Sequence, residues 1–242
     1  MQNHGVDIIA ISGLGGHAFG SFKEPGGEHI FQNLEDLGTS LHSDLRALIS
    51  YGSFKPIVFI AHSLGGLIVK QFLISLSKSM NDVDQRLRSA IYGIAFFGVP
   101  HDGMDIRSLI PMAGDGPNRF LLESIGFNNS QILNIQQREF SDALGVNHEF
   151  EIISFYETRL SPTALRDNKS GKWTMSAEPA VLVSKASATH CRPWEDGPEH
   201  ICAINRTHSE MVKFSQEDSE YEKVLGRIKS LTRRAIKTRR GM

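Results

Sequence analysis

The 242-residue chain has only two cysteines, a net charge of −1 and no apolar run of the length needed to span a membrane. We therefore expect no disulfide framework, and we interpret Cys191 and Cys202 as free thiols of a reducing compartment. The balanced charge gives no field that would favour nucleic acid or an anionic membrane surface. Residues 1–5 also lack the features of a signal peptide. These absences favour a globular, cytoplasmic protein with no nucleic-acid partner and no transmembrane segment.

The sequence also lacks the Gly-Lys-Ser/Thr element of a phosphate-binding loop. Gly13, Gly15 and Ala18 do match a dinucleotide fingerprint, but that site needs an acidic residue about 20 positions on, at the end of a second strand. Asp36 lies near that distance inside a leucine-spaced helical pattern, so we predict no nucleotide cofactor. We predict no metal site either, because no zinc spacing is found in the late histidines and cysteines His190, Cys191, His200, Cys202 and His208.

Short apolar runs alternate with helical patterns along the chain. The runs rich in Ile, Val and Phe predict buried parallel strands at 6–12, 56–62, 90–99, 148–156 and 180–184. Helical spacing of apolar residues predicts helices at 34–48, 64–76 and 219–231. Residues 120–144 are expected to form one or two more helices. Polar or Pro/Gly-rich stretches predict loops at 161–178 and 192–205. The alternation predicts an α/β fold with a doubly wound, mostly parallel sheet, forming one domain over 1–232 with a basic tail at 233–242.

The segment PIVFIAHSLGGLIVKQFL places a serine where a predicted strand changes into a helix. Ser63 has Ala61 and Gly65 two positions to either side, the G-x-S-x-G spacing of a nucleophile elbow with alanine for the first glycine. Small residues let this strained turn pack against its neighbours and hold the hydroxyl above the sheet. The helix N-terminus that follows directs its amides at developing negative charge. We predict Ser63 as a nucleophile, against the alternative of a structural Ser-Gly turn.

A serine hydroxyl needs an adjacent base, and after an elbow the triad follows the chain order serine, acid, histidine. His190, His200 and His208 all come late enough in the chain. We prefer His208 because it directly precedes the last predicted helix, whereas the other two flank a loop rich in proline and glycine.

The acid is expected at the carboxyl end of the strand before the last one, where ligands gather in open α/β sheets. Glu157 occupies that position in FEIISFYETRLS and would orient the imidazole and stabilise its protonated form. Two alternatives stay open. Glu157 could be a surface carboxylate paired with Arg159, and Asp102, which follows the third strand, could supply the acid instead.

Two backbone amides are predicted to form an oxyanion hole. The amide of Leu64 directly follows the nucleophile, and the second donor is expected in a loop after an earlier strand. The segment SGLGG at 12–16 is such a loop, so we assign the second donor to Leu14, with Gly15 as the alternate.

Six segments occur in an order that resembles a known family: SGLGGHAFGSF, FIAHSLGGLIVKQFL, IAFFGVPHDG, SFYETR, LVSKASAT and THSEMVKFSQEDSEYEKVL. Over residues 6–228 the chain resembles serine esterases and lipases of the α/β-hydrolase fold that include GPI-inositol-deacylase-like lipases. It is most similar to the N-terminal hydrolase domains of fungal NACHT or ankyrin-repeat proteins. The resemblance implies a serine hydrolase of lipid or acyl esters, with Ser63, Glu157 and His208 as the triad. It also implies peripheral membrane contact, association with mitochondria or endoplasmic reticulum, and a place in a longer multidomain protein.

The chain departs from the family pattern in two places. Ser12 stands where the family usually has a histidine before the glycine loop. Residues 19–34 contain no apolar run, so a strand that the family carries there is expected to be missing, leaving strand 6–12 at a sheet edge. These departures motivate a second hypothesis, a catalytically impaired hydrolase fold used for interaction or signalling.

Overall fold

The computed structural model describes residues 5–13, 33–49, 55–113, 118–127, 130–145, 150–167, 170–190, 195–215 and 217–240. Within them, a five-stranded sheet has the order β1-β2-β3-β4-β7, and all four pairings are parallel. Its strands are β1 (Asp7–Ile11), β2 (Ile57–His62), β3 (Ile91–Phe97), β4 (Glu151–Glu157) and β7 (Ile201–Ile204). Because the strands are parallel, their carboxyl ends share one edge of the sheet, which is where catalytic groups of such folds gather.

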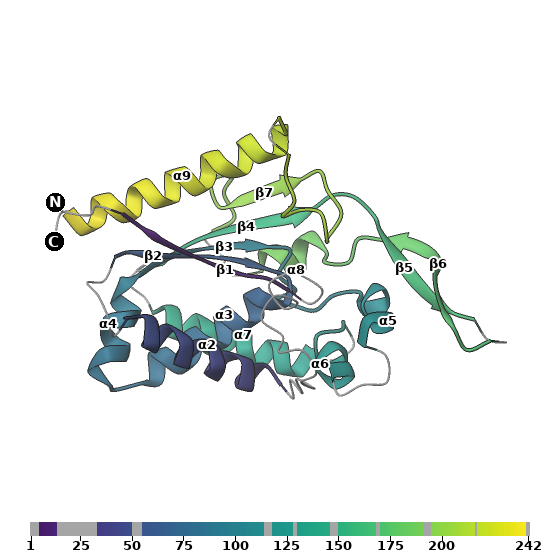
Figure 1. Cartoon of the computed structure of the whole chain (residues 1–242), viewed down its shortest axis with the longest axis horizontal. Coiled ribbons are helices and arrows are strands. Elements are labelled where there is room, and N and C mark those ends of the chain that lie inside the picture. The colour runs from purple at the N-terminus through teal and green to yellow at the C-terminus, as the bar shows by residue number, and fades with distance from the viewer. Residues whose placement is uncertain are drawn as a thin grey trace.

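Helices cover both faces of this sheet (Figure 1). One face is covered by α2 (Leu34–Ile49), α3 (Leu64–Lys78), α4 (Asp82–Ala90) and α7 (Ser130–Leu144), and the other by α9 (Ser219–Arg240). Each face has its own apolar core: Leu67 and Phe72 of α3 belong to one, whereas Ile228 and Leu231 of α9 pack in the other. The prediction of an α/β fold with a doubly wound, mostly parallel sheet is confirmed.

Local sequence explains where the long helices begin. The Asn33 side chain accepts a bond from the Asp36 amide (2.8 Å) and caps α2. Asp218 accepts a bond from the Glu220 amide (2.9 Å) and caps α9. The helix α9 continues past residue 232, and Ala235 is fully buried, so part of the predicted basic tail belongs to a packed helix.

The prediction of a strand at 180–184 is wrong. Residues 181–184 form a loop in which Leu182 and Val183 are buried, so their apolar character reflects core packing without strand pairing. The fifth strand of the sheet is β7, which lies within the stretch predicted as a loop at 192–205. It is only four residues long (ICAI) and follows Gly197 and Pro198, so its apolar run is too short to be recognised by period.

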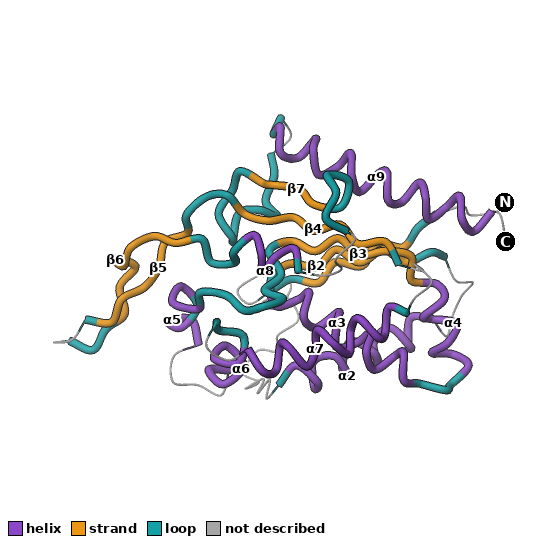
Figure 2. Tube along the Cα trace, turned by 180° about the vertical axis from the view of Figure 1, so that it is seen from behind, coloured by secondary structure: helices purple, strands orange, loops and turns teal. Residues whose placement is uncertain are grey.

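The loop predicted at 161–178 is also wrong, because most of it forms an antiparallel hairpin of β5 (Ser161–Arg166) and β6 (Trp173–Ala180). The hairpin projects from the body at the end where β4 finishes (Figure 2). Few of its side chains are buried, so the apolar alternation that marks a strand is weak here. The shorter helices are η1 (Ile106–Ser108), α5 (Ile110–Ala113), α6 (Asn118–Ser124) and α8 (Lys185–Thr189). Of these, α5 and α6 lie on the same side of the molecule as the hairpin (Figure 1).

β1 forms an edge of the sheet in the described part of the chain, as expected. The Ile8 side chain is 52% exposed there, although the strand reads as a buried one. The predicted absence of a strand at 19–34 falls almost wholly outside the described residues. Among the helices described, none combines the length and the apolar character required to span a membrane.

Two helical glycines give a matched test of packing. A Cβ at Gly66 would overlap the Val99 side chain, whereas a Cβ at Gly226 has no neighbour within 4 Å. We expect Gly66→Ala to lower the free energy of unfolding by roughly 1–3 kcal/mol through overpacking. Gly226→Ala should raise it by roughly 0.5–1 kcal/mol through helix propensity and reduced chain entropy. Urea unfolding of both variants measures the difference, and equal stabilities would contradict the packing argument.

Candidate active site

The backbone turns sharply at Ser63, between the end of β2 and the start of α3. Ser63 has φ 53° and ψ −128°, and among the described residues it alone has a positive φ without being glycine. Such a conformation costs about 1–3 kcal/mol and persists only where the surroundings impose it. The Ser63 amide donates to the Phe97 carbonyl of β3 (2.9 Å), which anchors the turn to the neighbouring strand.

Neighbouring backbone explains why the positions around Ser63 are small. A Cβ at Gly65 would lie 2.6 Å from the Ile11 carbonyl oxygen, and a Cβ at Gly13 would lie 2.7 Å from the Ser63 Cβ. β1 and the residues after it therefore approach the elbow closely. Ala61, in place of the usual first glycine, is fully buried in the sheet.

The structure brings Ser63, His208 and Glu157 together in one line of contacts. His208 Nε2 lies 2.9 Å from Ser63 Oγ, and His208 Nδ1 lies 2.6 Å from Glu157 Oε2. All three residues are at least 95% buried. With Nδ1–H donating to the carboxylate, Nε2 is free to accept a proton from the serine hydroxyl. This arrangement suits general-base activation of a hydroxyl nucleophile.

The second oxygen of Glu157 is held by backbone amides that the sequence analysis missed. Oε1 accepts from the Leu182 amide (2.7 Å) and the Val183 amide (3.2 Å). Bonds to a buried carboxylate stabilise its charged form. No side-chain pattern marks such donors, because any residue except proline supplies an amide. The only sequence feature that marks these donors is the apolar run at 180–184, which predicts a strand and not a packed loop.

The alternative candidates lie elsewhere. Asp102 Oδ2 forms a hydrogen bond with His190 Nδ1, and both side chains are partly exposed to solvent. His200 Nδ1 lies 2.9 Å from the Ile152 carbonyl oxygen. The Arg159 guanidinium donates to the Asn205 side chain (3.0 Å), whereas Glu157 contacts His208.

Of the two predicted oxyanion donors, Leu64 is the first residue of α3. The first amides of a helix have no partner within their own helix, so this amide is suited to an external acceptor. Leu14 and its alternate Gly15 lie outside the described residues. In the described part of the chain, no group of three or more His, Cys, Asp or Glu side chains converges as a metal site would require. Cys202 is a buried free thiol, and Cys191 is outside the described residues.

His62, the residue before Ser63, also contacts His208. Its Nε2 lies 2.9 Å from the His208 carbonyl oxygen, and the two imidazole rings have centroids 5.0 Å apart. Burial, and secondly the nearby His208, lower the pKa of His62 to about 3. His62 is therefore neutral over the pH range in which most enzymes work.

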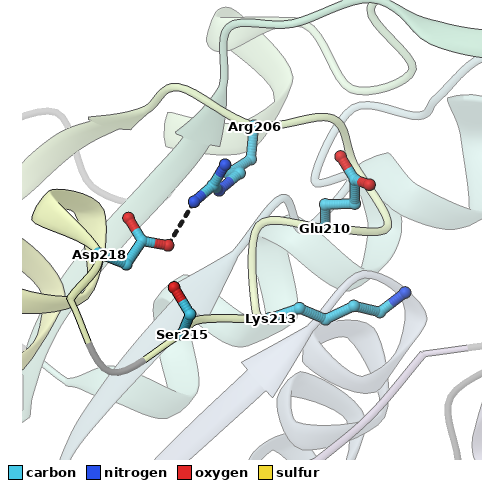
Figure 3. Close-up of a pocket in the computed structure, with 5 residues that line it drawn as sticks. All are labelled: Arg206, Glu210, Lys213, Ser215 and Asp218. Atoms are coloured by element: carbon cyan, nitrogen blue, oxygen red, sulfur yellow. Dashed lines mark hydrogen bonds and ion pairs between the residues drawn. The ribbon is translucent and has the colours of Figure 1, made fainter.

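A cavity of about 260 Å³ adjoins the segment that carries His208. It is lined by Arg206, Glu210, Lys213, Ser215 and Asp218, as Figure 3 shows. Arg206 and Asp218 point toward each other and form an ion pair, while the Lys213 side chain extends away from them. With two acids and two bases in its wall, the cavity has no net charge that would favour an anion or a cation.

Comparison with known proteins gives partial similarities. No family model matches the chain. Protein SERAC1 of Bos taurus is 43% identical over 51 residues, which are 20% of this chain and 7% of that protein. Protein SERAC1 of Danio rerio is 28% identical over 118 residues, 43% of this chain and 15% of that protein. The chain therefore spans a small part of these curated relatives.

Solved structures of low sequence identity resemble the chain. The lin2722 product of Listeria innocua has a TM-score of 0.48 and 14% identity, over 93% of this chain and 94% of that chain. Phospholipase PlaB from Legionella pneumophila, in complex with thio-NAD, has a TM-score of 0.46 and 13% identity, over 76% of this chain and 44% of that chain. Mature lipase BlEst2 of Bacillus licheniformis has a TM-score of 0.45 and 14% identity, over 66% of this chain and 69% of that chain.

The lowered pKa of His62 predicts an acid-dependent loss of stability. Between about pH 3 and the ordinary histidine pKa of 6.5, the unfolded chain binds more protons at this histidine than the folded chain. The free energy of unfolding should therefore fall as pH drops through this interval, by about 5 kcal/mol at most for this group. Denaturant titrations at several pH values should show that the free energy of unfolding depends less steeply on pH in His62→Gln than in the wild type. Parallel pH dependences for the two proteins would refute the assignment.

Proposed function

We propose that the protein is a serine hydrolase of carboxylic esters with Ser63 as nucleophile, His208 as base and Glu157 as the acid that orients the base. The observation that carries the proposal is the 2.9 Å contact between His208 Nε2 and Ser63 Oγ at a strained strand-to-helix turn. The 2.6 Å contact of Glu157 with the other ring nitrogen supports it, because this contact selects the tautomer that leaves Nε2 able to accept a proton.

The reaction follows from the geometry in two halves. Ser63 Oγ attacks the ester carbonyl carbon while His208 Nε2 takes the hydroxyl proton, and the Leu64 amide donates to the developing oxyanion. The tetrahedral intermediate collapses by breaking the bond to the alkoxide, which leaves as the alcohol with the proton from His208. Water, deprotonated by His208, then attacks the acyl-enzyme, and the second collapse returns the proton to Ser63 and releases the carboxylic acid. Leu14 is proposed as the second oxyanion donor.

Lipid or acyl esters are the proposed substrate class, on the family resemblance of the sequence. Exposed apolar side chains support it: Phe120 of α6, and Leu165 and Met175 of the β5–β6 hairpin, are each at least 57% exposed. Both elements lie at the end of the molecule where β3 and β4 finish (Figures 1 and 2). The same side chains would suit peripheral contact with a membrane. The relation to fungal hydrolase domains, the compartment and a place within a longer protein remain predictions of the sequence.

Covalent labelling with a fluorophosphonate probe tests the nucleophile. We expect the folded protein to be labelled, and Ser63→Ala to abolish labelling because the phosphonylated oxygen is removed. Ser77→Ala is the matched control, because Ser77 lies on the same helix α3 and bonds only to the Ile74 carbonyl in its own turn (2.8 Å). An unlabelled but cooperatively folded protein would instead favour the non-catalytic interaction module.

Ester-hydrolysis kinetics distinguish the two candidate acids. Glu157→Gln should lower kcat by roughly 10²–10⁴-fold, because a neutral amide neither fixes the required tautomer nor stabilises the imidazolium. Asp102→Asn should leave kcat within about threefold, because Asp102 contacts His190 and not His208. A loss confined to Asp102→Asn would reverse the assignment of the acid.

A further inference from the structure

His208 lies in a turn between β7 and α9, so neither a helix nor a strand ladder supplies partners for its peptide groups. Two side chains take that place. The His208 amide donates to Ser161 Oγ (3.1 Å), and the His208 carbonyl accepts from His62 Nε2 (2.9 Å). Ser161 is 4% exposed, as is His208, so the bond between them is buried, whereas the bond from His62 is partly buried. Leaving a buried partner unpaired is costly.

The two side chains come from the segments that carry the other members of the triad. His62 directly precedes Ser63 at the end of β2, and Ser161 follows Glu157 by four residues, at the start of β5. His208 is thus bound through its ring to Ser63 and Glu157, and through its backbone to a neighbour of each. Any movement of the turn relative to either strand would stretch a ring contact and a backbone contact together.

The chemical state of His62 suits the role of a donor. A neutral imidazole has one N–H, and the carbonyl oxygen of His208 can only accept. Nε2 of His62 therefore carries the proton. The lowered pKa of His62 keeps the ring neutral, so it adds no positive charge beside the base when His208 itself becomes protonated during the reaction.

We infer that His62 and Ser161 are positioning residues that hold the base His208 by its own carbonyl and amide, in line with Ser63 and Glu157. The inference rests on the proposed hydrolase function for its kinetic consequences, but not for the contacts themselves. Misplacement of a base by about 1 Å costs on the order of 10²-fold in rate. Loss of either bond should therefore lower kcat and leave KM nearly unchanged. The polar group of each side chain is bonded to the backbone of His208 and not placed to bind substrate.

The test compares variants that remove or retain each bond. We expect His62→Leu and Ser161→Ala to lower kcat for a soluble acyl ester by roughly 10- to 100-fold, with KM changed less than about threefold. His62→Gln keeps an N–H donor and should recover most of the lost kcat. His200→Phe is the matched control, since His200 also bonds a backbone carbonyl through one ring nitrogen but lies away from the triad. Thermal unfolding of each variant shows whether a lower kcat arises from a misplaced His208 in a folded protein or from loss of the fold.

Nuclear magnetic resonance tests the position of His208 without any measurement of substrate turnover. The proton on His208 Nδ1, shared with Glu157, should give a downfield resonance that is absent in His208→Gln. We expect it to be retained in His62→Gln and lost or exchange-broadened in His62→Leu and Ser161→Ala. If wild type hydrolyses no ester, this pattern still supports the inference while the proposed function fails. The inference is overturned if the resonance and kcat survive His62→Leu, if His62→Gln is as impaired as His62→Leu, or if His200→Phe lowers kcat equally.

Discussion

The backbone turn at Ser63 constrains the structure around it more than any other feature described. A residue with a side chain at φ 53° is strained, and the strain is held by the bond from its amide to Phe97 and by the close approach of β1. Neither glycine can be larger, because a Cβ at Gly65 would meet the backbone of β1 and a Cβ at Gly13 would meet the Cβ of Ser63. The turn thereby couples three adjacent strands, β1, β2 and β3, to the position of one hydroxyl group.

The carboxylate of Glu157 plays a comparable part on the other side of the site. One oxygen faces His208, and the other accepts two amides from the 181–183 loop. That loop is in turn bound to the segment after β3, because the Asp105 amide donates to the Leu182 carbonyl (2.7 Å). Packing of Leu182 and Val183 into the core fixes the loop, so apolar burial here determines the geometry of a charged group.

The sequence predicted the parts of this molecule that repeat a simple pattern. The four longer strands of the sheet have continuous apolar runs, and the helices α2, α3 and α9 have helical periodicity. The strand-to-helix turn at Ser63 has small residues at a fixed spacing, and the sequence predicts each of these features. Residues 181–184 and β7 were interpreted wrongly because burial alone does not distinguish a packed loop from a strand, and a four-residue strand has no measurable period. The residues of the candidate site came from position along the chain. The backbone donors to Glu157, and the bonds that His62 and Ser161 make to His208, depend on tertiary geometry that no local pattern encodes.

The β5–β6 hairpin leaves the sheet just after Glu157 and returns at Leu182, whose amide binds that same carboxylate. The chain between the two points is therefore an excursion whose ends are held next to each other by the bond from the Leu182 amide to the Glu157 carboxylate. Changing the length of a loop between fixed ends costs little free energy, because the entropy of loop closure varies only with the logarithm of the loop length. Beyond Ser161, which bonds to the His208 amide, this position could accept hairpins of different size or composition without moving Glu157. The projecting part of the hairpin is therefore free to diverge while the residues beneath it stay the same.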